Sequence, residues 1–145
     1  MPGARLAEPL HRPAVHAGVG EAGPVFEIPL DLVRRNAAEW GVDNINAVLP
    51  DDVPDSVRLR SIRSNPPIRV GKHELHGLLE RWIPRLDERG DAWLVVQRNL
   101  GSDSLQRWLA ATFDDGYSVA RAATGGGFRV LKVRRHDAPA DPTPA

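Results

Sequence analysis

The sequence of 145 residues has no cysteine, one methionine and one tyrosine. The absence of cysteine excludes disulfide bonds and thiolate nucleophiles, and it favours a cytoplasmic location. No apolar stretch approaches the roughly 20 residues of a membrane-spanning helix, and the N-terminus lacks the hydrophobic region of a signal peptide. The 19 basic and 19 acidic side chains balance. This neutrality argues against a surface devoted to nucleic acid, although it allows a local basic patch.

The sequence predicts one folded region between two compositionally biased ends. Residues 1–25 are rich in Pro, Gly and Ala, and residues 136–145 form a Pro/Asp/Ala tail. Such segments bury too little apolar surface to offset the entropy of ordering. We therefore expect residues 1–25 to be disordered or degenerate and residues 136–145 to be disordered. The length fits one domain at most, which we place at residues 26–135.

Hydrophobic periodicity predicts alternating helices and strands in that domain. Apolar side chains recur at helical spacing from Leu75 to Leu86, and Pro84 weakens the last turn of this helix. The expected elements are helices at 29–40, at 73–86 and from a cap at Ser102 or Asp103, and strands at 45–49, 57–63, 92–97, 118–123 and 128–134. This order predicts an α/β fold with a mostly parallel sheet and a C-terminal antiparallel hairpin.

The most informative motif is Ser64-Asn65-Pro66-Pro67, directly after a predicted strand. Proline fixes φ, lacks an N–H and restricts the preceding residue to extended backbone, so the motif would aim the Asn65 amide outward from the strand end. The Asn65 side-chain oxygen and the Pro66 carbonyl oxygen could both accept hydrogen bonds from an exocyclic NH2 group. Two such acceptors would pull the amine nitrogen toward a nucleophilic geometry. A plain turn is the competing interpretation, because Ser, Asn and Pro all favour turns.

Two further stretches extend the pattern on either side of this motif. The upstream stretch is Leu30-Asp31-Leu32-Val33-Arg34-Arg35-Asn36-Ala37-Ala38, running into Gly41-Val42-Asp43-Asn44, and the downstream stretch is Trp93-Leu94-Val95-Val96-Gln97-Arg98-Asn99-Leu100-Gly101-Ser102, completed by Gly127-Phe128-Arg129-Val130-Leu131. Together the three resemble the methyltransferase small domain group of class I S-adenosylmethionine (SAM)-dependent methyltransferases. That group includes ribosomal RNA guanine-N2 methyltransferases. The resemblance covers about residues 30–135.

The resemblance implies a fold, a reaction and a set of site residues. The fold would be a partial Rossmann-like methyltransferase sheet, and the cofactor would be SAM. The reaction would be N-methylation of a nucleobase amine, with guanine N2 of ribosomal RNA as the acceptor. The implied partner is RNA, with no membrane. The implied catalytic residues are Asn65, Pro66 and Pro67, the substrate-binding residues are Ile68, Arg69 and Lys72, and the cofactor-binding residues are Asp52 and Ser64. Ile68 departs from the aromatic residue that usually stacks on the base at its position.

The sequence also departs from the family upstream of residue 30. Residues 18–23 spell G-x-G-x-x-G, but only Pro13-Ala14-Val15-His16-Ala17 precedes them, which is too short and mixed for a convincing buried strand. Pro24 follows where a helix should start, and there is no space for a further helix and strand. A dinucleotide-binding loop needs that context, so we do not expect these glycines to bind the cofactor. The resemblance thus implies an N-terminally truncated domain.

Arginines interrupt the strand before the Asn-Pro-Pro motif. Arg60 and Arg63 stand where a central parallel strand should be almost continuously apolar, and burying them unpaired would be costly. Either the strand is half exposed, or the sequence has drifted from a working enzyme. The alternative function is therefore a catalytically inactive remnant that acts as an interaction module or as half of a split enzyme. An exposed sheet edge would then favour a homo-oligomer or a partner chain.

Other candidate sites give weaker signals. His73, His76 and Glu80 lie one helical turn apart, but no second ligand cluster supports a metal site, and we expect none. The four tryptophans could stack on bases, but we expect them in the core: they are Trp40, Trp82, Trp93 and Trp108. Four cations near the C-terminus could contact phosphates or belong to a solvated edge strand: they are Arg129, Lys132, Arg134 and Arg135. Gln97-Arg98-Asn99 follows the best strand, at the sheet end where ligands bind in open α/β folds.

Overall fold

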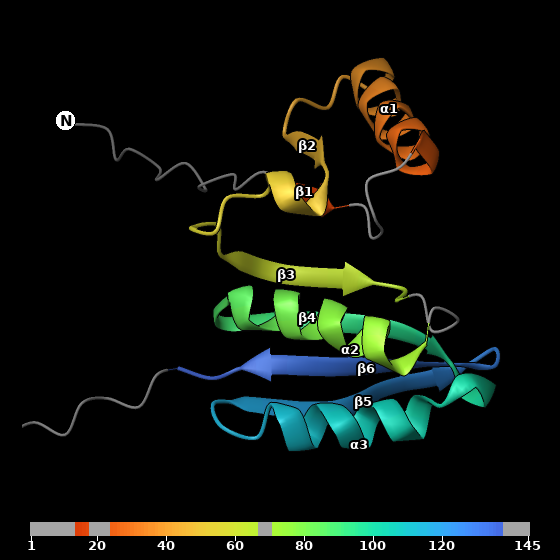
Figure 1. Ribbon diagram of the computed structural model, residues 1–145, viewed down its shortest axis with the longest axis vertical. Coiled ribbons are helices and arrows are strands. Elements are labelled where there is room, and N and C mark those ends of the chain that lie inside the picture. Colours follow the sequence, from red (N-terminus) through yellow and green to blue (C-terminus); the bar gives the residue numbers. More distant parts are fainter. Residues whose placement is uncertain (1–13, 18–23, 67–70, 138–145) are drawn as a thin grey trace, which may run out of the picture. The chain divides into compact units, whose positions relative to one another are not determined.

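The computed structural model describes residues 14–17, 24–66 and 71–137, which divide into two compact units (Figure 1). The first unit comprises residues 1–56 and the second residues 57–145. The boundary lies just before the strand that leads into Asn65.

The first unit is a β-α-β arrangement. Strand β1 (Ala14–Ala17) pairs in parallel with β2 (Ile45–Val48), and helix α1 (Pro24–Glu39) connects them. A 3-10 helix at Pro50–Asp52 follows β2. Two expectations were therefore wrong: a strand does precede the glycine motif, and there is space for a helix and a second strand. Residues 18–23 themselves lie outside the described residues.

The start of α1 also differs from the expected one. The helix begins at Pro24 rather than Pro29. Proline is favoured at the first helical position, because an N–H there would have no partner within the helix and the fixed φ already suits it. Pro24 therefore does not prevent a helix from starting after the glycine motif, as the sequence argument assumed.

Few side chains are buried between residues 30 and 56, where the structure describes the side chains of this unit. Leu30 on α1 is buried, as are Ala47 on β2 and Val53 after the 3-10 helix. The Arg34 Nη2 atom donates a hydrogen bond to the Ala47 carbonyl oxygen over 2.8 Å, which ties α1 to β2. Trp40 is 82% exposed, so its predicted place in the core was wrong. Trp40 lies in the turn after α1, so it is not part of the helix face that packs against β2.

The second unit contains one four-stranded sheet and two helices. The strand order is β3-β4-β6-β5; β3 and β4 are parallel, while the β4–β6 and β5–β6 pairs are antiparallel. The α/β class and the C-terminal hairpin are thus confirmed, and this sheet is mixed. Its helices and strands are β3 (Leu59–Ser64), α2 (Lys72–Trp82), β4 (Leu86–Gln97), α3 (Ser102–Thr112), β5 (Tyr117–Gly125) and β6 (Phe128–Arg135).

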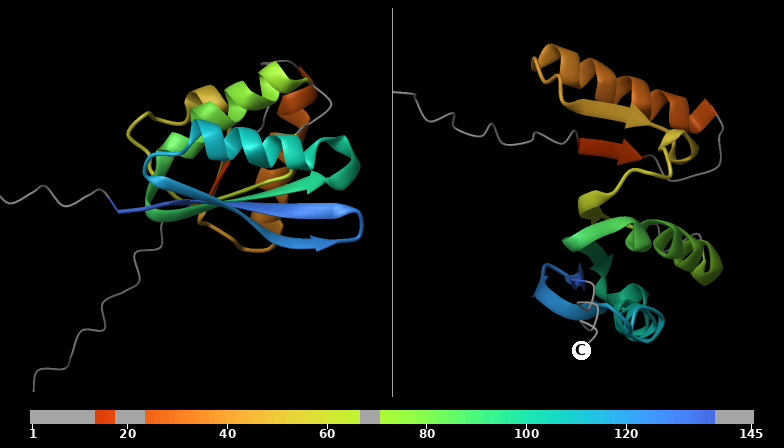
Figure 2. Two further views of the ribbon diagram at one scale, coloured as in Figure 1. Left: turned by 90° about the horizontal axis from the view of Figure 1, so that it is seen from below. Right: turned by 90° about the vertical axis from the view of Figure 1, so that its left-hand side faces the viewer.

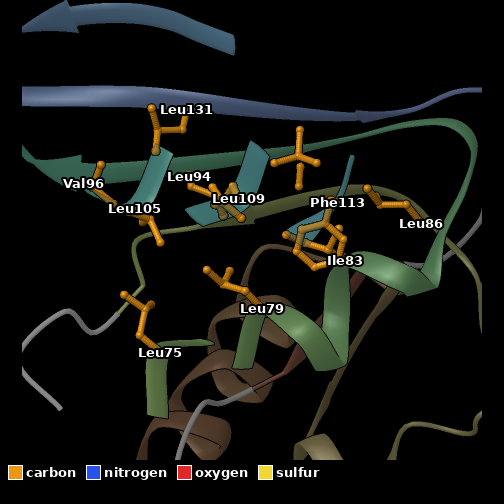
Figure 3. Close-up of a cluster of buried hydrophobic side chains, with 12 residues drawn as sticks. Leu75, Leu79, Ile83, Leu86, Leu94, Val96, Leu105, Leu109, Phe113 and Leu131 are labelled. Atoms are coloured by element: carbon orange, nitrogen blue, oxygen red, sulfur yellow. The ribbon is translucent and has the colours of Figure 1, made fainter. Parts of the chain in front are cut away.

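Helices α2 and α3 cover the same face of this sheet (Figure 2). The side chains of β4 alternate, so Ala92, Leu94 and Val96 point to the helices and are fully buried. Figure 3 shows the cluster that these strands and helices form. Its members are Leu75, Leu79, Ile83, Leu86, Ala92, Leu94, Val96, Leu105, Leu109, Phe113, Leu131 and Val133. Burial of this set supplies the main apolar driving force for folding the second unit.

Several element ends differ from the expected ones for local reasons. Helix α2 stops at Trp82 and passes into a 3-10 turn at Ile83–Arg85, as a proline at position 84 favours. Strand β4 starts at Leu86, six residues early, because Leu86 pairs with Leu59 ahead of the irregularity that precedes Asp91. The expected cap of α3 was wrong: the N-cap is Gly101, and Ser102 is inside the helix with its Oγ directed to the Arg98 carbonyl oxygen at 3.4 Å.

Strand β3 lies at the edge of the four-stranded sheet. Arg60 and Arg63 are exposed, whereas Leu59, Ile62 and Ser64 are half-buried. Of the two explanations for the arginines, the half-exposed strand is the one observed. Charged side chains on an edge strand also hinder unwanted pairing with other chains.

Candidate active site

The candidate acceptor site lies in the second unit, at the edge of the sheet where β3, β4 and β5 all end. Strands β3 and β4 are parallel, and β5 runs with them because β6 is antiparallel to both of its neighbours. We call this the carboxyl edge; it comprises residues 64–66, 97–100 and 125–128. The Arg98 N–H donates to the Gly127 carbonyl oxygen over 2.8 Å, which joins the end of β4 to the hairpin turn. Ligands of open α/β sheets bind at such an edge.

The Asn-Pro-Pro motif begins at this edge. Ser64 is half-buried, ends β3 and pairs with Leu94 of β4. Asn65 is exposed, whereas Pro66 is buried. The buried proline fixes the chain directly after Asn65, so the exposed amide projects from a constrained backbone. The residues predicted to follow in the site, Pro67, Ile68 and Arg69, lie outside the described residues.

Lys72 is the first residue of α2 and is exposed. The N-cap before it is Gly71, whose φ of 103° is readily reached only by glycine. Figure 1 shows that α2 starts on the side of the sheet where β3 ends. The Lys72 ammonium group is thus available to an anion near the carboxyl edge.

The cations near the C-terminus are arranged differently from either expectation. Strand β6 lies between β4 and β5, so it is not an edge strand. The Arg129 side chain is only 9% exposed, and its Nη1 atom contacts the Asp103 carboxylate and, at 3.2 Å, the Ser102 hydroxyl. Sequence reasoning missed this ion pair of a buried arginine, because cross-strand register rather than composition decides which face Arg129 occupies.

The other three of these cations also have partners within the protein. Lys132 Nζ lies 4.7 Å from the centroid of the Trp93 ring and 3.8 Å from the Asp91 carboxylate, and Arg134 lies 3.5 Å from that carboxylate. Arg135 donates to the Leu86 carbonyl oxygen over 2.5 Å. These side chains brace β6 against β4, so the structure gives no support to a phosphate-binding role for them.

One of the two helical histidines, His76, is used in packing. The His76 ring lies flat against Trp108, with ring centroids 3.7 Å apart and planes inclined by 6°. His73 and Glu80 are exposed. In the part of the chain that the structure describes, no group of three or more His, Asp or Glu side chains could hold a metal ion.

The tryptophans of the second unit are packed to different degrees. Trp82 is buried, between the guanidinium groups of Arg81 and Arg85 at 5.3 and 5.1 Å from its ring. Trp93 and Trp108 are half-buried. The predicted core position is therefore confirmed in full for Trp82 alone among the four.

The residue expected to contact the cofactor adenine lies in the first unit. Asp52 ends the 3-10 helix after β2, and its N–H donates to the Leu49 carbonyl oxygen over 3.0 Å. Its side chain is exposed. An exposed carboxylate just beyond the carboxyl end of a parallel strand can accept hydrogen bonds from a ribose hydroxyl or an adenine amine. The described residues of this unit thus fit the chemistry of a nucleoside-containing cofactor. Among the described helices, none is long and apolar enough to cross a membrane.

The sequence is similar to a known protein family and to a known protein. The family model for the methyltransferase small domain matches residues 27–132. The uncharacterized protein YbxB of Bacillus subtilis is 29% identical over 114 residues, which are 77% of this chain and 55% of that protein. The chain thus spans about half the length of this curated relative.

Solved structures show the same fold. The T. thermophilus 16S rRNA N2 methyltransferase RsmC, in complex with AdoMet and guanosine, superposes with a TM-score of 0.53 at 18% identity; the match covers 77% of this chain and 29% of that one. An rRNA methylase from Streptococcus thermophilus gives a TM-score of 0.63 at 13% identity, over 86% of this chain and 74% of that one.

Proposed function

The chain belongs to the methyltransferase small domain family, and we propose that it is a SAM-dependent N-methyltransferase of a nucleobase amine. The proposed acceptor is guanine N2 in ribosomal RNA. The observation that carries the proposal is the exposed Asn65 amide, held between the end of β3 and the buried Pro66. The similar fold of RsmC, solved with AdoMet and guanosine, supports it.

The role of Asn65 and Pro66 is to orient the amine. The Asn65 side-chain oxygen and the Pro66 carbonyl oxygen accept its two N–H groups. The nitrogen lone pair is then directed away from the ring and toward the methyl donor. Holding the reacting atoms in line in this way can remove about 7–11 kcal/mol of the barrier. The protein needs no nucleophile of its own, because the amine supplies the attacking electron pair.

The cofactor role is assigned to Asp52 and Ser64. Asp52 would hold the adenosine part through its exposed carboxylate, and the half-buried Ser64 hydroxyl would donate a hydrogen bond to the cofactor. When bound, SAM supplies an electrophilic methyl group on a positively charged sulfur. The leaving thioether is neutral, so no acid is required to assist its departure. The amine proton passes to solvent.

RNA is the proposed partner. A base within a helix must be flipped out before its amine can reach Asn65, and proteins hold such a nucleotide by its phosphates as well as by its base. Lys72 at the start of α2 and Arg69 in the preceding segment are assigned to the phosphates. Pro67 and Ile68 would contact the base beside Asn65. A ribosomal substrate implies a cytoplasmic location.

Calorimetric titration of SAM into the purified chain, followed by transfer of a labelled methyl group to ribosomal RNA, tests the proposal. Asn65→Ala is expected to lower the turnover rate by about 100-fold with little change in SAM affinity, because Asn65 contacts only the acceptor. Asn36→Ala, which removes an exposed amide on α1, is the matched control and should leave both unchanged. If the folded chain binds no SAM, the proposal that this chain alone is an active methyltransferase is refuted.

The second candidate function is half of a split enzyme, or an inactive remnant that binds a partner. One observation favours it: β3 is the edge strand of its sheet. A partner chain would add a strand next to β3. Methyl transfer that requires a second polypeptide would identify the split enzyme, whereas binding of a partner without any transfer would identify the remnant.

A further inference from the structure

The exposed apolar side chains of the second unit gather near one edge of the sheet. Among its described residues, three large apolar side chains are at least 36% exposed: Val95 (36%), Leu100 (40%) and Phe128 (37%). Phe128 opens β6, Leu100 follows the end of β4, and Val95 lies two residues before that end. Single exposed apolar residues are normal, but a group at the ligand-binding edge of a sheet indicates a binding surface.

Strand register places Phe128 and Val95 next to each other. Phe128 pairs with Gln97, and Val95 pairs with Val130, so the two side chains are diagonal neighbours on one face. This face is opposite the helices, because Leu94, Val96 and Leu131 point to α2 and α3. Ser64 pairs with Leu94, so the position after it, Asn65, comes level with Val95. Two strand spacings, about 10 Å, separate β3 from β6.

The residues on both sides of Phe128 are held by contacts with other parts of the unit. The turn before it contains Gly126 and Gly127, with φ values of 56° and 79°, and the Gly127 carbonyl oxygen accepts the Arg98 N–H. The residue after it is the buried Arg129, paired with Asp103. A residue whose neighbours are held in this way loses less backbone freedom when it contacts a ligand.

The acceptor amine belongs to a flat base, and a flipped base is held by stacking on aromatic side chains as well as by its edge. The residue after Pro67 is Ile68, which has no ring. Among the aromatic residues described in this unit, Trp82 and Phe113 are buried, while Trp93, Trp108 and Tyr117 are half-buried. Phe128 is the aromatic residue of this set that is exposed, and it lies at the carboxyl edge.

We propose that Phe128 is a base-stacking residue of the RNA site, with Val95 beside it on the same face of the sheet. This inference rests on the proposed function, since it assumes a base whose amine is presented to Asn65. It adds a residue from the hairpin to a site otherwise formed by β3 and the segment after it. Phe128 orients the base and does not take part in the transfer itself.

The test uses the full chain and a single-stranded RNA carrying 2-aminopurine, whose fluorescence reports stacking and needs neither SAM nor methyl transfer. Phe128→Ala and Phe128→Leu are expected to weaken RNA binding by about 5- to 150-fold, the range for loss of one stacked base. Phe128→Tyr should retain the fluorescence change. Leu32→Ala, which removes an exposed apolar side chain of α1, is the matched control and should bind like the unmodified chain.

Several outcomes would overturn the inference. It fails if the chain does not bind the RNA, or if Phe128→Leu binds as well as the unmodified chain, because leucine keeps the apolar surface and lacks the ring. It also fails if the substitutions change only self-association, which would make the surface a protein interface. Methyl transfer that is insensitive to Phe128→Leu would support the proposed function and refute the inference on Phe128. Stacking that depends on Phe128 without any methyl transfer would support the inference and refute the proposed function.

Discussion

The two units of the chain differ sharply in how much of their apolar surface is buried. In the described residues of 57–145, twelve buried side chains form one cluster between the sheet and two helices. In residues 30–56, the part of the first unit whose side chains are described, the buried side chains are Leu30, Ala47, Pro50 and Val53, while Leu32, Trp40 and Val42 are exposed. A two-stranded sheet has little independent stability. The second unit thus has a continuous core that supports the candidate acceptor site, and no comparable cluster is described within residues 30–56.

The largest expected effect comes from the core of the second unit. Leu94→Ala should lower the free energy of unfolding by about 2–5 kcal/mol, because a fully buried side chain leaves a cavity that its neighbours fill only partly. The same substitution at Leu30, which is buried but does not belong to that cluster, should cost less than about 2 kcal/mol. Urea denaturation measures both. Equal losses would show that the first unit has as cohesive a core as the second.

Gly90→Ala should cost about 1–3 kcal/mol. A Cβ atom at this position would lie 2.8 Å from the Asp87 carbonyl oxygen and 3.1 Å from those of Leu59 and Arg60. These are backbone atoms, so relief requires moving the start of β3 or β4. Gly77→Ala in α2 is the control: its Cβ meets nothing within 4 Å, and alanine there should stabilise the helix by up to about 1 kcal/mol. A neutral Gly90→Ala would mean that this irregular part of the β3–β4 pairing is loosely held.

The two units also differ in how far their structure could be predicted from the sequence. In the second unit, helical spacing in 73–86, the apolar run at 92–97 and the glycines at 125–127 each specify a structure locally, and all were confirmed within a few residues. In the first unit, strand β1 exists because it pairs with β2, about thirty residues away. Four residues of mixed polarity carry no local signal of that pairing.

The candidate site divides in the same way. The Asn65 motif could be predicted because proline constrains its neighbours locally. The positions of Arg129 and Phe128 depend on the register of β6 against β4, and register was not predictable from composition. A signal was present in retrospect: a residue directly after a glycine turn begins its strand at the sheet edge, and the next residue faces the opposite side.

Asp103→Asn should cost about 1 kcal/mol, a smaller effect than those above. The Arg129 guanidinium is almost completely buried, but the Asp103 side chain is 62% exposed, so solvent screens part of the attraction and asparagine still offers an oxygen. Arg121→Met removes the exposed partner of Asp103 and should cost less. Salt should reduce the difference between Asp103→Asn and the unmodified chain. A larger loss for Arg121→Met would show that the pair buried on β6 is not the one that holds α3.

At the surface the difference between the units should vanish. Asp31–Arg35 in the first unit and Asp137–Arg89 in the second are both exposed pairs, at 2.9 and 2.8 Å. Exposed pairs contribute little in any context, so Asp31→Asn and Asp137→Asn should give equally small shifts of the unfolding midpoint in urea at neutral pH. A clear excess for Asp137→Asn would show that the second unit is more cohesive even at its surface.

The pH dependence of the Asp137–Arg89 pair follows from the direction in which folding shifts the pKa of Asp137. The hydrogen bond donated by Arg89 lowers the pKa of Asp137 below its ordinary 3.8. A carboxyl whose pKa is lowered by folding stabilises the folded chain above pH 3.8, and this contribution is lost as the pH falls through the folded-state value. The effect of Asp137→Asn should therefore disappear in acid below that value. An NMR titration of the Asp137 carboxyl carbon with a midpoint at or above 3.8 would show that the hydrogen bond does not persist in solution.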